Sequence, residues 1–131
     1  MTMLTREQIL QADDIKTEVV QVPEWEGDVI VRALMGNARD KFEQGMIEQK
    51  GKKIKLDRVG ARAKMCALSC VDEEGNLLFT EMDVIALGKK SSAALDRVYE
   101  VASRLSGLDE EDMDELVGNS ESNQSDNSTS D

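Results

Sequence analysis

Histidine is absent from the 131 residues, and proline and tryptophan occur once each. Without histidine the chain can form no imidazole metal site, no Ser-His-Asp triad and no Cys-His pair. No apolar run approaches the roughly 20 residues that a membrane-spanning helix needs, and the first residues lack the layout of a signal peptide. These absences favour a cytosolic protein that is not an enzyme, with no metal, no cofactor and no membrane partner.

Cysteine is also rare, and the two thiols, Cys66 and Cys70, lie four residues apart in a segment that reads as a helix. Helix geometry does not favour a disulfide at this spacing. A metal site built on two cysteines would need two further soft ligands, which this composition does not offer. We therefore interpret both as small apolar residues in a reducing compartment.

Acidic residues outnumber basic ones by 27 to 16, which gives a formal charge of −11. The excess is uneven, because residues 1–108 hold 18 acidic and 16 basic residues, whereas residues 109–131 hold nine acidic and no basic ones. Residues 118–131 contain no apolar side chain, so we expect a disordered polar tail after a single folded domain of residues 1–117. An acidic chain repels a phosphate backbone, so no nucleic-acid partner is expected.

Two β-branched runs with alternating polarity, 16–22 and 28–34, predict an antiparallel hairpin whose five-residue loop contains Pro23 and Gly27. Thr5 and Gln8 form a capping box that starts a short helix, with Leu4 and Ile9 as its hydrophobic staple. The remaining chain reads as helical. Helices are expected over 37–49, 57–71 (capped by Asp57, with Val59 on its buried stripe), 80–87, 91–105 and 108–118. Met46, Met65 and Met82 are expected in the core. The predicted fold is α+β: an N-terminal antiparallel β-hairpin packed on a mostly helical body of about residues 37–117.

Several charged stretches admit two interpretations. The acidic run 72–76 does not match the spacing of an EF-hand calcium loop and reads as a solvated turn. Residues 109–112 fit a favourable interaction with a helix dipole better than a catalytic carboxylate pair. The one basic cluster has no interleaved aromatic residues, so it reads as a solvated connector or a dock for an acidic partner, such as the chain's own tail. It consists of Lys50, Lys52, Lys53, Lys55 and Arg58.

The order of several motifs resembles the tail assembly chaperones of long-tailed, siphovirus-type bacteriophages. The resemblance spans about residues 4–117 and includes LTREQILQADD (4–14), KTEVV (16–20), VPEWEGDVIVR (22–32), CVDEEGN (70–76), LDRV (95–98) and RLSGL (104–108). It implies a protein of the host cell cytoplasm that binds the tape measure protein, keeps it soluble, helps recruit the major tail protein, and is absent from the mature virion. Programmed ribosomal frameshifting is common in such proteins. Further partners are then the chain itself and a longer frameshifted form.

Candidate partner contacts follow from this resemblance. Trp25 in the hairpin loop is either a core plug or a contact anchor. Apolar edges of the 91–105 and 109–117 helices supply further candidates, although Leu95 equally fits the core. These further candidates are Leu95, Tyr99, Leu108, Met113 and Leu116.

Two other classes of function compete with this interpretation. An acidic phage protein could inhibit a host nucleic-acid-binding protein by charge mimicry, but the body of residues 1–108 has a net charge of only −2. A small enzyme is the third class, and the lack of histidine and of a recognisable site argues against it.

Overall fold

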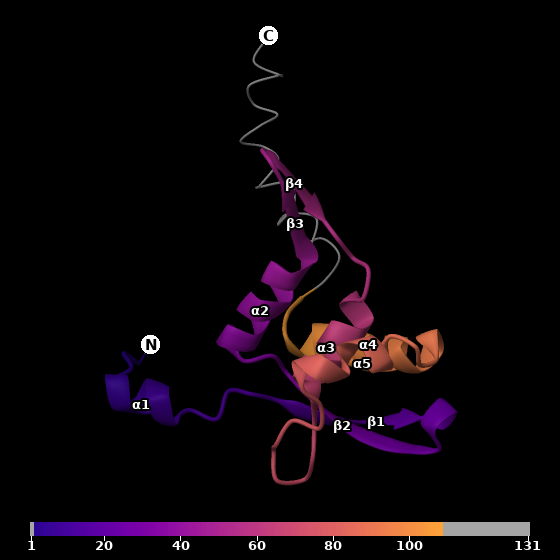
Figure 1. Ribbon diagram of the computed structural model, residues 1–131. Helices are drawn as coiled ribbons and strands as arrows, with labels where there is room; N and C mark the ends of the chain where they lie inside the picture. Colours follow the sequence, from indigo (N-terminus) through magenta and orange to yellow (C-terminus); the bar gives the residue numbers. More distant parts are fainter. Residues whose placement is uncertain (1, 109–131) are drawn as a thin grey trace.

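The computed structural model describes residues 2–108. The predicted helix over 108–118, the predicted tail of 118–131, the domain boundary at 117 and the candidates Met113 and Leu116 therefore lie outside the described residues, apart from Leu108 itself. Within residues 2–108 the chain combines antiparallel strands with helices, which confirms the α+β fold class (Figure 1).

The predicted N-terminal hairpin is confirmed as strands β1 (Thr17–Val22) and β2 (Gly27–Arg32), which pair antiparallel with Val22 opposite Gly27. The connection is shorter than the predicted five residues, because Gly27 already belongs to β2. Its turn is a short 3₁₀ helix, η1 (Pro23–Trp25), followed by Glu26 with a φ of 55°. Proline fixes the first φ of such a turn, which explains its place there.

A third strand, β5 (Cys70–Val71), pairs with β2 and gives the order β1-β2-β5. The predicted helix over 57–71 is therefore wrong at its C-terminal end. In the structure the helix is α3 (Ala61–Ser69), and residues 70 and 71 belong to the strand. Cys70 ends that helix with extended backbone dihedrals and joins the sheet opposite Val31. Sheet pairing with a residue 39 positions earlier therefore overrides the helical pattern of this segment.

The start of α3 also differs from expectation. Asp57 does not cap the helix; its carboxylate accepts a hydrogen bond from the Val59 backbone N–H at 3.0 Å. The residue before α3 is Gly60, whose φ of 79° suits glycine. Val59 was expected on the buried stripe, but 81% of it is exposed, because it precedes the helix and does not share its periodicity.

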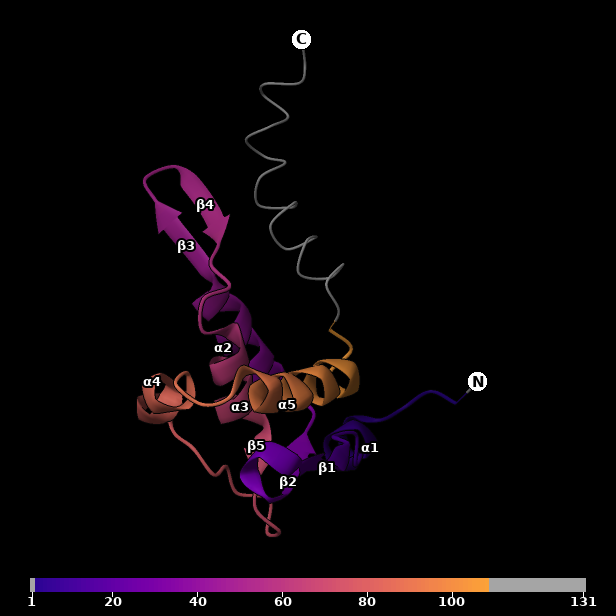
Figure 2. The same cartoon turned by 90° about the vertical axis from the view of Figure 1, so that its right-hand side faces the viewer.

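Three helices build the body above the sheet: α2 (Gly36–Met46), α3 and α5 (Ser92–Leu105). Helix α5 lies on β1 and β2, α3 packs on α5, and α2 packs on α3 (Figures 1 and 2). The predicted helix over 91–105 is confirmed, with the Ser91 hydroxyl accepting from the Ala94 N–H at 3.2 Å. The largest fully buried side chains come from all these layers. They include Phe42, Met46, Met65, Val22, Val31 and Val98.

The predicted helix over 37–49 ends at Met46, and the next residues form a second, separate hairpin. Strand β3 (Ile47–Lys50) pairs antiparallel with β4 (Lys53–Leu56) across a turn at residues 51–52. The segment read as a basic connector is thus a β-hairpin. It projects from the end of α2 away from the sheet and from the other helices (Figures 1 and 2).

The capping box predicted at Thr80 is confirmed: its backbone N–H donates to the Asp83 carboxylate at 2.8 Å. It starts one turn of 3₁₀ helix, η2 (Glu81–Asp83), which continues into α4 (Val84–Leu87) and stops at Gly88. Met82 was expected to be a core residue, but it is 90% exposed. The turn buries Leu87 instead, so the opposite side of this short segment faces outward.

Candidate partner-binding surfaces

Two of the predicted contact residues lie in the core. Leu95 and Leu108 are each 5% exposed and belong to the main apolar cluster. The expectation that they line an exposed helix edge is therefore wrong, and the alternative of a core position for Leu95 is correct. Leu95 is buried because α5 is sandwiched between the sheet and α3 and buries its apolar stripe.

Trp25 and Tyr99 are partly buried and packed against the same core. The Tyr99 ring lies 6.4 Å from the Phe42 ring, and the Arg62 guanidinium lies 5.9 Å from the Tyr99 ring centre. Trp25 thus occupies the position expected of a core plug. Both side chains keep some accessible surface, but their main environment is the protein itself.

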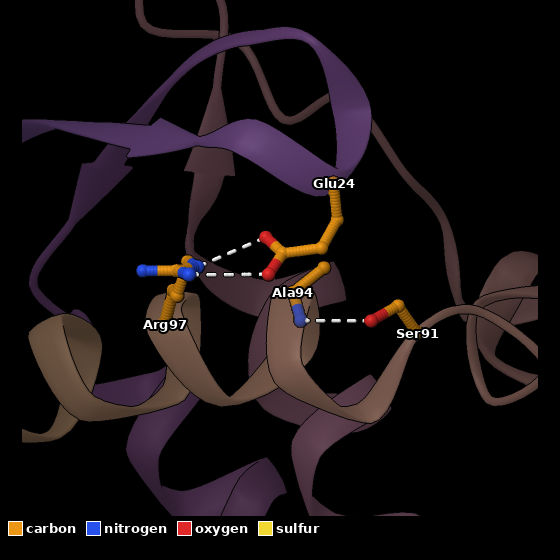
Figure 3. A network of polar contacts seen from close by, with 4 residues as sticks. All are labelled: Glu24, Ser91, Ala94 and Arg97. Carbon is orange, nitrogen blue, oxygen red and sulfur yellow. Dashed lines mark hydrogen bonds and ion pairs between the residues drawn. The ribbon is translucent and has the colours of Figure 1, made fainter.

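Glu24 beside Trp25 anchors the hairpin turn to α5 (Figure 3). The Arg97 guanidinium donates two hydrogen bonds to the Glu24 carboxylate, at 2.9 and 3.1 Å. These bonds hold the pKa of Glu24 below its ordinary value and raise that of Arg97. Arg104 makes a similar contact with Glu18 on β1 at 2.8 Å. Glu24 of the hairpin turn and Glu18 of β1 are thus both paired with arginines of α5.

The N-terminal arm, defined as residues 2–14, is exposed along its whole length. Its helix α1 (Arg6–Gln11) has the predicted capping box, in which the Gln8 N–H donates to the Thr5 hydroxyl at 3.2 Å. Figure 1 shows α1 beyond the end of the sheet, away from the packed helices. The arm carries large apolar side chains that are more than half exposed, and the predicted staple pair is among them. They are Met3 (84%), Leu4 (65%), Ile9 (56%) and Leu10 (67%).

Such an arm lacks the support that a short helix normally needs. Isolated helices of fewer than about 12 residues are marginal in water, and α1 has six residues, none of them buried. A capping box satisfies two backbone groups but contributes no apolar burial. The arm therefore has the properties of a segment that gains its packing from another protein.

A second apolar patch lies on η2 and α4. Met82 and Ile85 are three residues apart and 90% and 77% exposed, respectively. Residues 77 and 78 before this segment are about half exposed as well. This patch was not expected from the sequence, because the spacing of Met82 and Ile85 is equally typical of a buried face.

The cysteines lie deep in the core, with their Sγ atoms 3.4 Å apart. Contact with the Cys66 sulfur and burial raise the pKa of the Cys70 thiol.

Within residues 2–108 no group of three or more His, Cys, Asp or Glu side chains is placed to hold a metal ion. In the same range no helix combines the length and apolarity needed to cross a membrane.

An α+β body with an exposed apolar arm, an apolar patch and a projecting basic hairpin defines a small protein-binding protein. The sequence model of the phage tail assembly chaperones matches residues 5–119. The chain therefore belongs to the phage tail assembly chaperone family, as its motif order indicated. No curated protein matches it.

The fold has a counterpart among solved structures. The tail assembly chaperone of bacteriophage HK97 aligns with a TM-score of 0.54 and 19% sequence identity, covering 76% of this chain and 94% of that one. At this identity the similarity establishes a shared fold. It also shows that most of the HK97 chain has an equivalent here.

Proposed function

We propose that this chaperone binds the tape measure protein of its phage and keeps it soluble until the tail tube encloses it. Family membership supplies the general role, and the resemblance noted in the sequence supplies the partner. A tape measure protein outside its tube exposes long amphipathic helices, which aggregate unless their apolar faces are covered. The observation that carries the proposal is the unsupported, apolar N-terminal arm.

The arm suits reversible binding. Leu4, Ile9 and Leu10 offer apolar area on a short helix that can lie along an amphipathic partner helix. Full burial of each side chain is worth roughly 1.5–3 kcal/mol. Ordering of the arm offsets part of this gain, so several moderate contacts can be released when the tube protein replaces them.

The experiment is co-expression of the tape measure protein with the full chain, followed by measurement of its soluble fraction and by pull-down. The arm variant Ile9→Asp/Leu10→Asp is expected to reduce binding by roughly tenfold or more, since each charge replaces burial worth at least 1.4 kcal/mol. The comparison variant is Met82→Asp/Ile85→Asp, which places two charges in the other exposed apolar patch, where the side chains are more exposed (90% and 77%). It is expected to bind as the unmodified chain does.

The opposite pattern, with loss in the Met82/Ile85 variant alone, would move the interface to the α4 patch. Failure of the unmodified chain to bind or solubilise the tape measure protein would overturn the proposed function itself. Circular dichroism of each variant checks that the body remains folded.

The proposal includes later steps in the host cell cytoplasm. The chaperone helps recruit the major tail protein, which displaces it as the tube grows, so mass spectrometry of purified virions should not detect the chain. Its further partners are other copies of itself and a longer form made by programmed ribosomal frameshifting. A heptanucleotide slip site before the stop codon of the coding DNA would support that longer form.

A further inference from the structure

The β3–β4 hairpin concentrates positive charge at its exposed end. Lys50 and Lys53 are direct cross-strand partners, and Lys55, which lies opposite Glu48, follows two residues after Lys53 on the same face of β4. Like charges placed directly opposite each other destabilise a strand pair. All three lysines are exposed, so their ammonium groups are accessible to an anionic segment.

The excess of positive charge is confined to the segment that contains this hairpin. Residues 47–58 contain five basic and two acidic residues, whereas the rest of residues 1–108 contains 11 basic and 16 acidic ones. The hairpin is therefore a positive projection on an otherwise negative body. The most acidic segment of the same chain is 109–131, with nine carboxylates and no basic residue. The two segments are complementary in charge.

The fold also places the start of this acidic segment within reach. Leu108 is buried, and the Leu34 N–H donates to the Ser106 hydroxyl at 2.8 Å, so the end of α5 lies beside the chain that enters α2. The 11 residues of α2 span about 16 Å. Strands of four residues add about 13 Å. The hairpin tip therefore lies about 30 Å from the exit point, whereas 23 residues can extend up to about 76 Å.

We propose that the acidic segment 109–131 docks on the β3–β4 hairpin of its own chain and competes there with other polyanionic partners. Tethering gives the segment an effective concentration on the order of millimolar, so weak charge contacts suffice. The interaction is screened by salt, because the Debye length falls from about 30 Å at 0.01 M to 3 Å at 1 M ionic strength. Docking of the acidic segment on the hairpin does not depend on the tape measure protein.

Zero-length carbodiimide cross-linking of the full chain, mapped by mass spectrometry, tests this directly. Lysines of the hairpin are expected to form amide bonds with carboxylates of 109–131 at 0.01 M salt and to lose most of them at 1 M. Lys89 and Lys90 are the matched control. They are exposed and lie just before α5, whose 14 residues place them only about 21 Å from its other end.

A segment that is tethered but does not dock would react with Lys89 and Lys90 at least as often as with the hairpin, which would overturn the proposal. Mixing of ¹⁵N-labelled and unlabelled chains distinguishes the source of the carboxylate. Cross-links within one isotope support docking in the same chain. Mixed-isotope cross-links would overturn it in favour of docking between copies.

An independent measurement uses a fluorescent octaglutamate peptide as probe. Neutralising the six carboxylates between 109 and 115 with Asn and Gln is expected to tighten probe binding roughly two- to tenfold, because the internal competitor is removed. Adding Lys53→Glu and Lys55→Glu to that variant is expected to abolish this gain. Equal affinity of the unmodified and neutralised chains for the probe would contradict the competition.

Discussion

Replacing Leu95 by alanine separates a core residue from a partner contact. The substitution removes three side-chain carbons that are 95% buried between α5, the sheet and α3. At about 0.8 kcal/mol per buried carbon the lost transfer free energy is about 2.4 kcal/mol, and the remaining cavity adds to it. We expect the free energy of unfolding to fall by about 2.5–4 kcal/mol, which lowers Tm by roughly 10–25 °C.

Urea unfolding provides the assay, because Trp25 is the one tryptophan in the chain and packs against the core as a fluorescence probe. Circular dichroism gives a second probe, and an unchanged m-value assigns the effect to stability. Leu10→Ala is the matched control: 67% of Leu10 is exposed, so its change should stay within about 0.5 kcal/mol. A loss below about 1 kcal/mol for Leu95→Ala would refute the core placement.

Two further predictions concern groups that titrate. The buried thiols of Cys66 and Cys70 should react with a disulfide reagent at pH 8 only as fast as the chain unfolds. In urea both thiols should react at once. Rapid reaction without urea would contradict their burial. The Asn76 and Glu74 backbone N–H groups hold the pKa of Asp72 low, as Arg97 does for Glu24. At a pH above the ordinary pKa values of 3.8 for Asp72 and 4.5 for Glu24, both carboxylates therefore stabilise the fold. This stabilisation is lost as the pH falls through their lower pKa values in the folded state. Urea midpoints measured from about pH 5 to 2 should fall less steeply in the variant Glu24→Gln/Asp72→Asn.

Elements with local causes were predictable from the sequence. The capping boxes at Thr5 and Thr80 need only residues three positions apart, and both are present. The β1–β2 hairpin follows from alternation and a proline turn, and α5 from a serine cap and an apolar stripe. In each case the sequence signal lies within one segment, so the pattern is legible without knowledge of the distant partner.

Elements that depend on distant partners were not predictable from the sequence. Cys70 leaves its helix because β2 offers it strand pairing, and β3 and β4 form because two short polar segments pair with each other. The polar–apolar alternation of Lys53–Leu56 covers only four residues, which is too short to distinguish a strand from a connector, so the basic run read as a connector. Exposure was equally hard to predict, because an apolar stripe does not state which neighbour covers it.

The sequence by itself determined the family, the α+β class, the uneven charge and the locally capped elements. These properties depend on composition, motif order and contacts between residues close in the chain. Only the tertiary structure decided that Leu95 is buried and that Met82 and the N-terminal arm are exposed. It also decided that the lysine-rich segment projects as a hairpin from the end of α2 (Figure 1). Burial is a property of how elements are stacked on one another, and the same apolar pattern serves a core or a binding surface until that stacking is known.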